Sequence, residues 1–315
     1  MEVNLMQGQR DNLQDRVIGS LVGLACGDAV GTTLEFATKG TFKPLTDMIG
    51  GGPFNLNKGQ WTDDTSMALC LAHSLLEKQG FDAKDQMERY CKWHNHGYMS
   101  STGRCFDIGI TVSRALRQYQ ITNIPFSGTT DKYSSGNGSI MRLAPIPIYY
   151  FSDINACMLY AQESSRTTHG SPLCLDACRL LSYLIRKAFT SQCKNDIFEQ
   201  IPGHFCSELD PVTTFNFKEL DYSVLTGSGY VIDSLISALW CFYHSNTFKE
   251  SILLAANIGN DADTTAAICG QIAGAFYGFN GIPVDWRESI TMASDIKQLA
   301  SDLYKAGINN GAFAS

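Results

Sequence analysis

The stretch GNDADTTAAI, residues 259–268, is the point at which a polar loop turns into an apolar run with helical periodicity. The run that follows contains Gly270, Gly274 and Gly278, which are spaced four apart and therefore share one helix face. Glycine weakens a helix, so a stripe of glycine indicates that another backbone packs very closely against it. The stretch predicts a central helix that begins with an acidic turn.

A second glycine-striped helix is predicted near the N-terminus. Residues 17–30 are mostly apolar, and Gly19, Gly23 and Gly27 repeat the spacing of four. We expect the two striped helices at the centre of the domain, next to each other or to a shared neighbour. Residues that are distant in the sequence would then converge.

A second acidic cluster, WTDDT at residues 61–65, also opens an apolar run with helical periodicity. Each cluster offers two carboxylates and a threonine hydroxyl: Thr62, Asp63, Asp64, Asp261, Asp263 and Thr264. Hard oxygen donors of this kind suit Mg²⁺ or Mn²⁺ and not zinc. Either cluster alone could be only a helix N-cap, since Thr and Asp cap helices well. Two such clusters favour a metal site, because converging carboxylates need counter-charge.

Helical periodicity extends over most of the chain, and the alternation expected of strands is nearly absent. Further helices are predicted at residues 62–79, 84–95, 107–119, 154–164, 172–189, 231–242, 248–256 and 286–304. Residues 191–222 are either a surface excursion or an insertion of short helices. The pattern predicts an all-α protein with a single compact multi-helix domain at 15–306, a flexible N-terminal segment at 1–14 and a C-terminal tail at 307–315.

Composition narrows the functional classes. The chain has 24 Lys and Arg against 31 Asp and Glu, giving a net charge of −7 without a basic stripe, so we expect no nucleic-acid partner. We also expect no membrane partner, since the charge disfavours acidic bilayers and no apolar run is long enough to span one. Eleven cysteines without a Cys-x-x-Cys pair, behind an N-terminus unlike a signal peptide, predict reduced thiols in the cytoplasm. Secretion without a cleaved signal is left open, and we expect a monomer.

Several motifs resemble those of the ADP-ribosylglycohydrolase family, in the family's order. They are GDAVG at 27–31 followed by Glu35 and Phe36, WTDDTSM at 61–67, GNGSIMR at 136–142, Thr168 with His169, SGYV at 228–231 and GNDADT at 259–264. The resemblance runs from about residue 16 to residue 304 and is nearest to the dinitrogenase-reductase-activating glycohydrolase branch. It implies that family's compact all-α fold.

The resemblance also implies roles for the acidic residues. Two Mg²⁺ ions, or Mn²⁺ in their place, would be held by the Thr and Asp residues of the two acidic clusters. Glu35 matches the glutamate that approaches the metal pair and would position or deprotonate the attacking water. Asp63 would combine metal binding with contact to the ribose hydroxyls. Asp107 matches an aspartate near the scissile bond of arginine-directed members, although from the residues alone it could be a simple N-cap.

A substrate-binding set follows from the same resemblance. The segment Ser134, Ser135, Gly136, Asn137, Gly138 and Ser139 would surround the pyrophosphate and ribose, with His169 near the phosphates. Independently of the resemblance, Gly229 and Tyr230 could set an aromatic ring beside the adenine, since a base stacks on a flat face. Each has a structural alternative: a common Gly-Asn turn, a structural histidine and a core tyrosine.

The resulting hypothesis is a Mg²⁺-dependent, binuclear ADP-ribosyl hydrolase that removes mono-ADP-ribose from modified protein side chains, with arginine as the preferred linkage. Its partners would be an ADP-ribosylated protein and ADP-ribose. Two alternatives remain: hydrolysis of serine-linked or O-acetyl-ADP-ribose, and a non-catalytic ADP-ribose-binding or structural relative.

Overall fold

The computed structural model describes the backbone of residues 2–312 and the side chains of residues 12–309. Within residues 2–312 the regular structure is helical, and pairing of the strand type is limited to three isolated bridges. The helices are α1 (Glu2–Gly31), α2 (Asp63–Lys78), α3 (Ala83–His96), α4 (Ile110–Thr122), α5 (Pro145–Tyr149), α6 (Ile154–Arg166), α7 (Pro172–Ala188), α8 (Lys194–Ile197), α9 (Asp210–Thr213), α10 (Val231–Tyr243), α11 (Phe248–Ala256), α12 (Ala262–Tyr277), α13 (Val284–Ser289) and α14 (Ala293–Ala312). Short 3-10 turns lie between them at Thr32–Leu34, Lys132–Ser134, Ser207–Leu209, Asn216–Glu219, Tyr222–Val224 and Phe279–Gly281. The expectation of one compact all-α domain is confirmed.

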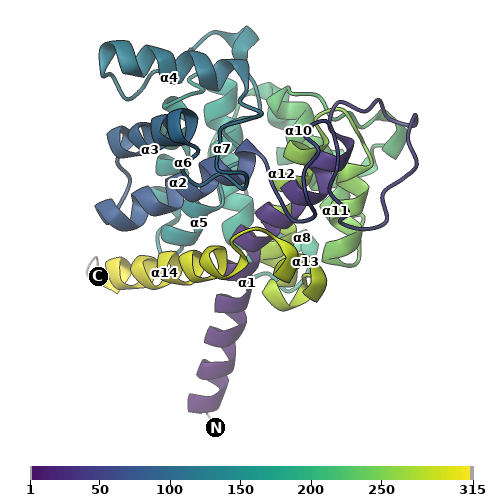
Figure 1. Cartoon of the computed structure of the whole chain (residues 1–315). Helices are drawn as coiled ribbons and strands as arrows, with labels where there is room; N and C mark the ends of the chain where they lie inside the picture. Colours follow the sequence, from purple (N-terminus) through teal and green to yellow (C-terminus); the bar gives the residue numbers. More distant parts are fainter. Residues whose placement is uncertain (1, 313–315) are drawn as a thin grey trace.

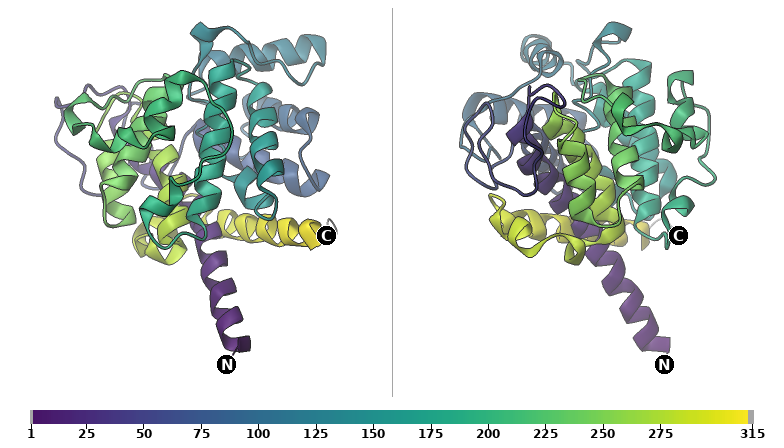
Figure 2. Two further views of the ribbon diagram at one scale, coloured as in Figure 1. Left: turned by 180° about the vertical axis from the view of Figure 1, so that it is seen from behind. Right: turned by 90° about the vertical axis from the view of Figure 1, so that its right-hand side faces the viewer.

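The two glycine-striped helices, α1 and α12, pack directly on each other at the centre of the molecule (Figures 1 and 2). The contacts run in antiparallel order: Gly19 on Gly274, Gly23 on Gly270, Gly27 on Ala266 and Gly31 on Ala262. A Cβ at any of these four α1 positions would come within 3.0 Å of the α12 backbone. The glycines are therefore required by the close approach of the helices. This packing places the C-terminal end of α1 beside the first turn of α12.

Helix α1 corrects one expectation from composition. Asn12–Leu34 is long enough and apolar enough to cross a membrane, with a mean hydropathy of 1.5, although no such run was expected. In the folded chain, 94% of the window is buried. Its apolar character follows from a position inside the fold, with α11, α12 and α14 around it.

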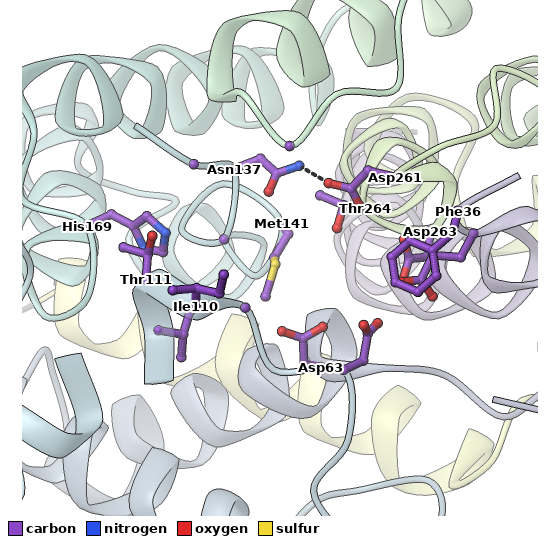
Figure 3. Close-up of a pocket in the computed structure, with 17 residues that line it drawn as sticks. Phe36, Asp63, Ile110, Thr111, Asn137, Met141, His169, Asp261, Asp263 and Thr264 are labelled. Atoms are coloured by element: carbon purple, nitrogen blue, oxygen red, sulfur yellow. Dashed lines mark hydrogen bonds between the residues drawn. The ribbon is translucent and has the colours of Figure 1, made fainter. Parts of the chain in front are cut away.

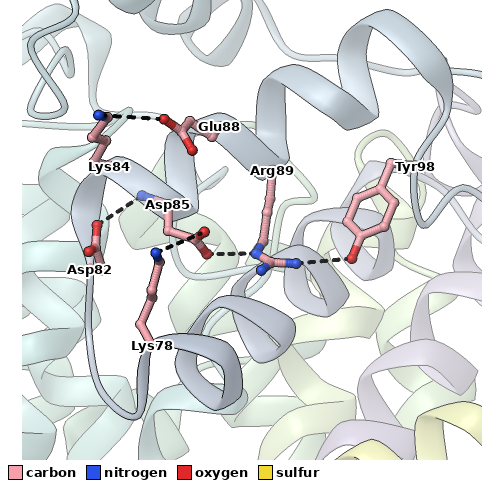
Figure 4. A network of polar contacts seen from close by, with 7 residues as sticks. All are labelled: Lys78, Asp82, Lys84, Asp85, Glu88, Arg89 and Tyr98. Atoms are coloured by element: carbon pink, nitrogen blue, oxygen red, sulfur yellow. Dashed lines mark hydrogen bonds and ion pairs between the residues drawn. The ribbon is translucent and has the colours of Figure 1, made fainter.

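A polar network fixes α3 on α2 (Figure 4). Asp82 caps α3 by accepting a hydrogen bond from the backbone N–H of Asp85 at 2.9 Å. The Asp85 carboxylate in turn pairs with Arg89 at 2.6 Å and lies 3.9 Å from Lys78 at the end of α2. Arg89 also donates to the hydroxyl of Tyr98 at 3.1 Å, which ties the loop after α3 to the same network.

Two predicted helices have different bounds in the structure. The helix expected at 286–304 is divided into α13 and α14, because Met292 has a φ of +59° and the preceding Thr291 donates its N–H to Gly59 O at 2.8 Å. The helix expected from Asp107 begins at Ile110, because Asp107 itself has a φ of +58°. Asp107 is therefore not the N-cap of α4, and Gly109 occupies that position.

Other expectations about the organisation of the chain have mixed outcomes. Residues 191–222 contain α8, α9 and several 3-10 turns with buried side chains such as Leu209 and Phe217, as expected of a short-helix insertion. Helices α1 and α14 run through the boundaries expected at residues 15 and 306, so neither boundary coincides with the end of an element. The eleven cysteines are free thiols, and seven of them are buried.

Candidate active site

The two acidic clusters lie at the first turns of α2 and α12, and α1 connects them. Asp28, a fully buried residue of α1, accepts hydrogen bonds from the backbone N–H groups of Thr62 at 2.9 Å and Thr65 at 3.0 Å. It also accepts from their two hydroxyls at 2.9 and 2.6 Å. The first N–H groups of a helix have no partner within the helix, so Asp28 caps α2 from a neighbouring element.

The interpretation of the clusters as simple N-caps is wrong. Thr62 and Asp261 occupy the N-cap positions of α2 and α12, yet neither side chain makes a capping hydrogen bond. Instead, the Thr62 hydroxyl lies 3.2 Å from Asp64 Oδ2 and 3.3 Å from Asp263 Oδ2. The hydroxyl of Thr264 donates to Asp64 Oδ1 at 3.2 Å. The side chains of the two helix starts thus face each other across a shared space.

Two groups of carboxylates have oxygens close enough together to hold a cation. One consists of Asp28, Asp64 and Asp263, and the other of Glu35, Asp107 and Asp263; within each group the oxygens lie within 4.8 Å of one another. Asp263 belongs to both groups. These buried acidic clusters can hold metal ions, and their oxygen-only composition suits Mg²⁺ or Mn²⁺.

The charges in this space are strongly coupled. Burial, followed by the nearby Asp107 carboxylate, raises the pKa of Glu35 to about 10. Burial also raises the pKa of Asp107 to about 7. The pKa values of Asp63 and Asp263 lie well above the usual range for the same reason, with neighbouring carboxylates adding to the effect. Without added positive charge, the site retains protons that carboxyl groups in water would lose.

Unpaired atoms in the site fit a metal-binding role. Glu35 Oε2 and Asp263 Oδ1 are buried and have no hydrogen-bond donor among the described residues. A buried polar atom without a partner is costly, and a carboxylate more so. Both residues belong to the group that Asp107 completes. A cation bound there would satisfy both oxygens and reduce the repulsion.

The loop that supplies Glu35 is fastened to the loop that supplies Asp261. The N–H of Phe36 donates to Asn260 O at 2.6 Å, and the N–H of Asn260 donates to Ala37 O at 2.7 Å. This pair of backbone bonds fixes Glu35 close to Asp263. The glutamate that was expected to approach the metal site is therefore among the carboxylates of the second group.

The acidic residues form one side of a cavity of about 270 Å³ (Figure 3). Asp63, Asp261, Asp263 and Phe36 lie towards one side of the cavity, and His169, Thr111 and Ile110 lie towards the other. The lining residues are Glu35, Phe36, Asp63, Asp107, Gly109, Ile110, Thr111, Val112, Gly136, Asn137, Gly138, Met141, His169, Gly229, Asp261, Asp263 and Thr264.

The glycine-rich segment is connected to the acidic side through Asn137. Its amide donates to Asp261 Oδ2 at 2.7 Å and to Ser234 Oγ at 2.9 Å. Its backbone N–H donates to Gly229 O at 3.1 Å, next to the bridge between Gly136 and Tyr230. The segment therefore joins the second acidic loop to the start of α10.

His169 is held by a chain of hydrogen bonds that begins at a buried cation. Arg142 is fully buried, donates to Gly138 O at 2.7 Å and to the Thr168 hydroxyl at 2.8 Å, and lies over the ring of Tyr90. The Thr168 hydroxyl lies 2.8 Å from His169 Nδ1. Because Arg142 can only donate, the hydroxyl hydrogen is free to be donated to Nδ1, and no other acceptor for it lies among the described residues.

This chain assigns the tautomer of His169. With Nδ1 accepting, the ring proton resides on Nε2, which has no hydrogen-bond partner among the described residues and lies against Gly138. Burial and the charge of Arg142 lower the pKa of His169 to about 3, so the ring is neutral. The cavity thus has one fixed N–H donor opposite the carboxylates.

A second cavity of about 620 Å³ adjoins the first and shares Thr111, Gly136 and Gly229 with it. Ser134, Ser135 and Tyr230 line this second cavity together with the exposed ring of Tyr133. Tyr230 is 39% exposed, so it is not the core tyrosine that the structural alternative required.

The structure brings most of the predicted site residues to these two cavities. Thr62 and Asp64 lie in the buried space behind the first cavity. Ser139 lines neither cavity, and its hydroxyl is buried without a hydrogen-bond partner.

Three kinds of site residue were not predicted from the sequence. Asp28 is part of the GDAVG motif but was not assigned a role, and only the folded chain shows which donors it accepts from. Phe36, which follows Glu35, lines the cavity as an exposed ring. Met141, which belongs to the GNGSIMR motif without an expected role, and the first turn of α4, including Thr111, complete the lining, and the α4 turn has no distinctive sequence signal.

Comparison with known proteins identifies relatives over nearly the whole chain. A family model described as ADP-ribosylglycohydrolase matches residues 9–312. The "ADP-ribosylarginine hydrolase Tri1" of Pseudomonas putida is 39% identical over 290 residues, which cover 92% of this chain and 78% of that protein. The "ADP-ribosyl-[dinitrogen reductase] glycohydrolase" of Rhodospirillum rubrum is 32% identical over 292 residues, covering 89% and 92% of the two chains.

A solved structure has the same architecture. A chain described as "ADP-ribosylglycohydrolase-related protein complex" superimposes with a TM-score of 0.83 and 39% sequence identity, covering 94% of this chain and 99% of that chain.

Proposed function

Because the chain belongs to the ADP-ribosylglycohydrolase family and is an ADP-ribosyl hydrolase, we propose that it removes mono-ADP-ribose from modified protein side chains, with arginine as the preferred linkage, using two divalent cations. It is a glycosidase, and its partners are an ADP-ribosylated protein and ADP-ribose. The linkage, the number of ions and the identity of the metal are the parts that we propose.

One observation carries the proposal of two cations. Asp263 lies in two carboxylate groups at once, one completed by Asp28 and Asp64 and the other by Glu35 and Asp107. Each group could hold one ion, with Asp263 contributing to both sites. In such a site Mg²⁺ or Mn²⁺ would orient the ribose hydroxyls and promote ionisation of a bound water.

Side chains of the protein would accept the proton, bind the ribose and stabilise the developing charge. Glu35 is close enough to the shared carboxylate to accept the proton of the attacking water. Asp63 faces the cavity and can accept a hydrogen bond from a ribose hydroxyl. The negative side of the cavity stabilises the positive charge that develops on the ribose as the glycosidic bond breaks.

The opposite side of the cavity has the character of a diphosphate site. His169 presents the Nε2–H, and the backbone of Gly136 and Gly138 allows an anion to approach closely. The second cavity, with Tyr230, is continuous with this side and is large enough for the adenosine. A base could stack on an exposed tyrosine ring.

Arginine is supported by the relatives and by the site. Both the Pseudomonas putida protein and its Serratia proteamaculans counterpart, each 39% identical to this chain, are named ADP-ribosylarginine hydrolases. The carboxylate of Asp107 belongs to the cavity and can attract a guanidinium. The alternatives of serine-linked or O-acetyl-ADP-ribose would use the same acidic residues with a neutral leaving group. A non-catalytic relative would have no need for a costly group of unpaired carboxylates.

A panel of substrates tests the proposal. Peptides with ADP-ribose on arginine, serine or glutamate should be incubated with the protein in Mg²⁺, Mn²⁺ or chelator, and release of ADP-ribose measured. We expect fastest release from arginine and none in chelator. Release from serine alone would overturn the linkage, and undiminished release in chelator would overturn the metal dependence.

We also propose that the protein acts as a cytoplasmic monomer, since one copy of the chain supplies both sides of the cavity. Light scattering on an active sample would contradict this if the active species were a dimer, and cell fractionation would test the compartment.

A further inference from the structure

An aromatic cluster, Phe36, Phe54 and Phe106, stands beside the acidic side of the cavity. The centroids of the Phe36 and Phe54 rings are 6.3 Å apart at an interplanar angle of 71°, and those of Phe54 and Phe106 are 5.2 Å apart at 61°. Phe36 directly follows Glu35, and Phe106 directly precedes Asp107. Two rings of the cluster are therefore neighbours in sequence of two carboxylates in the group that Asp263 completes.

Phe36 is held in an unfavourable position. Its side chain is 68% exposed, although its ring is large and apolar. Its φ of +60° lies in the left-handed region, which a bulky residue rarely adopts. The two backbone bonds to Asn260 hold it there. A strained backbone beside a cavity, presenting a ring to solvent, is the kind of departure from ordinary packing that points to a ligand.

Among the described residues, no basic side chain packs over the rings of the aromatic cluster. Elsewhere in residues 12–309, Arg and Lys side chains lie over aromatic rings, as Arg166 does over Phe126 at 4.3 Å. No described Arg or Lys lies over Phe36, Phe54 or Phe106. A free ring face next to carboxylates is an attractive environment for a cation that arrives from outside.

We propose that Phe36 selects a cationic leaving group, by receiving the guanidinium of an ADP-ribosylated arginine on its ring face while the neighbouring carboxylate of Asp107 attracts the same charge. This inference rests on the proposed hydrolase function and names the residue that sets its linkage preference. The aliphatic part of the arginine side chain would leave the cavity along the aromatic cluster.

The chemistry of the reaction determines which kinetic constant should change. When the C–N bond breaks, its electron pair goes to the guanidine nitrogen, and water supplies hydroxide to the anomeric carbon and a proton to that nitrogen. Positive charge moves from the guanidinium to the ribose in the transition state. A ring that favours the guanidinium therefore strengthens substrate binding without assisting the chemical step.

Kinetics of Phe36→Leu provide the test, since leucine keeps the apolar bulk and loses the aromatic face. For an arginine-linked peptide we expect KM to rise about two- to thirtyfold, as the range of cation–π strengths implies, without a fall in kcat, because the contact is made to the bound substrate and weakens in the transition state. For a serine-linked peptide, KM should stay within about twofold of the wild-type value because a neutral leaving group has no cation–π contact to lose. Phe36→Tyr should restore the wild-type KM. The matched control is Phe126→Leu, at another exposed phenylalanine that lines neither cavity, which should change neither constant.

A binding measurement keeps this inference distinct from the proposed function. With ADP-ribose at saturation, methylguanidinium should bind to the wild type more tightly than neutral methylurea, and Phe36→Leu should abolish the difference. Loss of that preference together with an arginine-specific KM change supports the role of Phe36. Equal KM changes for both linkages, or no change for arginine, overturn it even if the wild type is a good hydrolase. A wild type that hydrolyses neither peptide overturns the proposed function itself.

Discussion

The acidic and glycine-rich sides of the first cavity are both built from buried polar groups, but they differ in charge. On the glycine-rich side, Arg142, Thr168 and His169 form a chain of hydrogen bonds that orients His169 Nε2–H for a ligand, while Arg142 Nε and Ser139 Oγ have no partner among the described residues. On the acidic side, carboxylates face one another, and Glu35 Oε2 and Asp263 Oδ1 have no donor. The carboxylates of the acidic side repel one another and need a positive charge that the polypeptide does not supply there.

The difference indicates how the site divides its tasks. A hydrogen-bond donor that is already oriented needs no rearrangement when an anion binds, so binding carries no further free-energy cost for orienting it. The glycine-rich side is therefore suited to hold the unreactive part of the substrate. A cluster of repelling carboxylates binds cations strongly and is strained without them. The acidic side is therefore where charge is redistributed during the reaction.

The largest effect should come from Asp263→Asn, because this residue belongs to both carboxylate groups. The amide keeps the shape but removes a charge shared by two cation positions. Loss of one partner of a buried charge pair costs about 3–5 kcal/mol, so kcat/KM should fall by about a hundred- to several thousandfold. Asp285→Asn, an exposed aspartate 3.8 Å from Lys58, is the matched control and should have wild-type activity.

Thermal unfolding separates this effect from misfolding. Mg²⁺ should raise the Tm of the wild type and of Asp285→Asn, but raise that of Asp263→Asn much less. In chelator, Asp263→Asn should be at least as stable as the wild type because it has one fewer repelling charge. Equal Mg²⁺-dependent shifts in all three proteins would show that Asp263 binds no cation.

In the metal-free protein, the acidic and glycine-rich sides should make opposite contributions to the pH dependence of the free energy of unfolding. Glu35 and Asp107 bind protons more tightly in the folded chain, with pKa values raised to about 10 and about 7. Between pH 8 and pH 5 the folded state therefore holds more protons than the unfolded chain, and the free energy of unfolding should rise as pH falls, by up to about 1.4 kcal/mol per pH unit for each extra proton held. His169, with its pKa lowered to about 3, opposes this below about pH 6.5, where the unfolded histidine is protonated first.

Denaturant titrations at several pH values measure both contributions. His169→Gln should steepen the rise in stability below about pH 6.5, since it removes the opposing group. Saturating Mg²⁺ should flatten the rise, because cations replace protons as the counter-charge. A pH profile that is identical with Mg²⁺ and with chelator would contradict the comparison.

A smaller effect is expected from the hydrogen bond that fixes the His169 tautomer. Thr168→Val retains the shape of the side chain but removes the hydroxyl between Arg142 and Nδ1, whereas Thr168→Ser retains the hydroxyl. The valine variant should bind ADP-ribose about two- to tenfold more weakly, the worth of one ordinary hydrogen bond, and the serine variant should bind like the wild type. Nitrogen-15 NMR should show the Nε2–H tautomer of His169 in the wild type and in Thr168→Ser, and a mixture in Thr168→Val.

The smallest effect distinguishes two glycines next to His169. A Cβ at Gly138 would lie 2.9 Å from His169 Cε1, whereas one at Gly136 would lie 3.5 Å from Nε2, an ordinary contact. Gly138→Ala should displace the ring and weaken ADP-ribose binding about two- to fivefold, in line with the cost of a strained side chain. Gly136→Ala should have less effect. The reverse order, measured by calorimetry, would mean that the ring is not held against Gly138.

Much of the fold follows from local sequence. Glycines spaced four apart predicted two helices in close contact, and the structure pairs them directly. The break between α13 and α14 was not predictable, because it depends on hydrogen bonds between Thr291 and the distant Gly59 and Trp61.

Prediction of the site from local sequence has the same limit. The motifs predicted most of its carboxylates, since acidic residues at helix starts can be recognised in the sequence. Their pairing was not visible: Asp28 and Asp107 join the two groups, whereas the predicted ligands Asp63 and Asp261 line the cavity outside them. Asp107 in particular is the first residue of the helix that the sequence predicts at 107–119, and its positive φ arises from the fold around it.

The antiparallel contact of α1 with α12 has a consequence for folding of the protein during its synthesis on the ribosome. Ser20 and Gln271, which share a hydrogen bond across that contact, are 251 positions apart in the chain. Translation delivers α1 before α12, and the glycine face of α1 lacks this partner until α12 has been made. Closing so long a loop is the entropic step on which assembly of the catalytic centre depends. A nascent or truncated chain without α12 therefore has no partly working centre, and hydrolysis begins only when α12 has packed on α1.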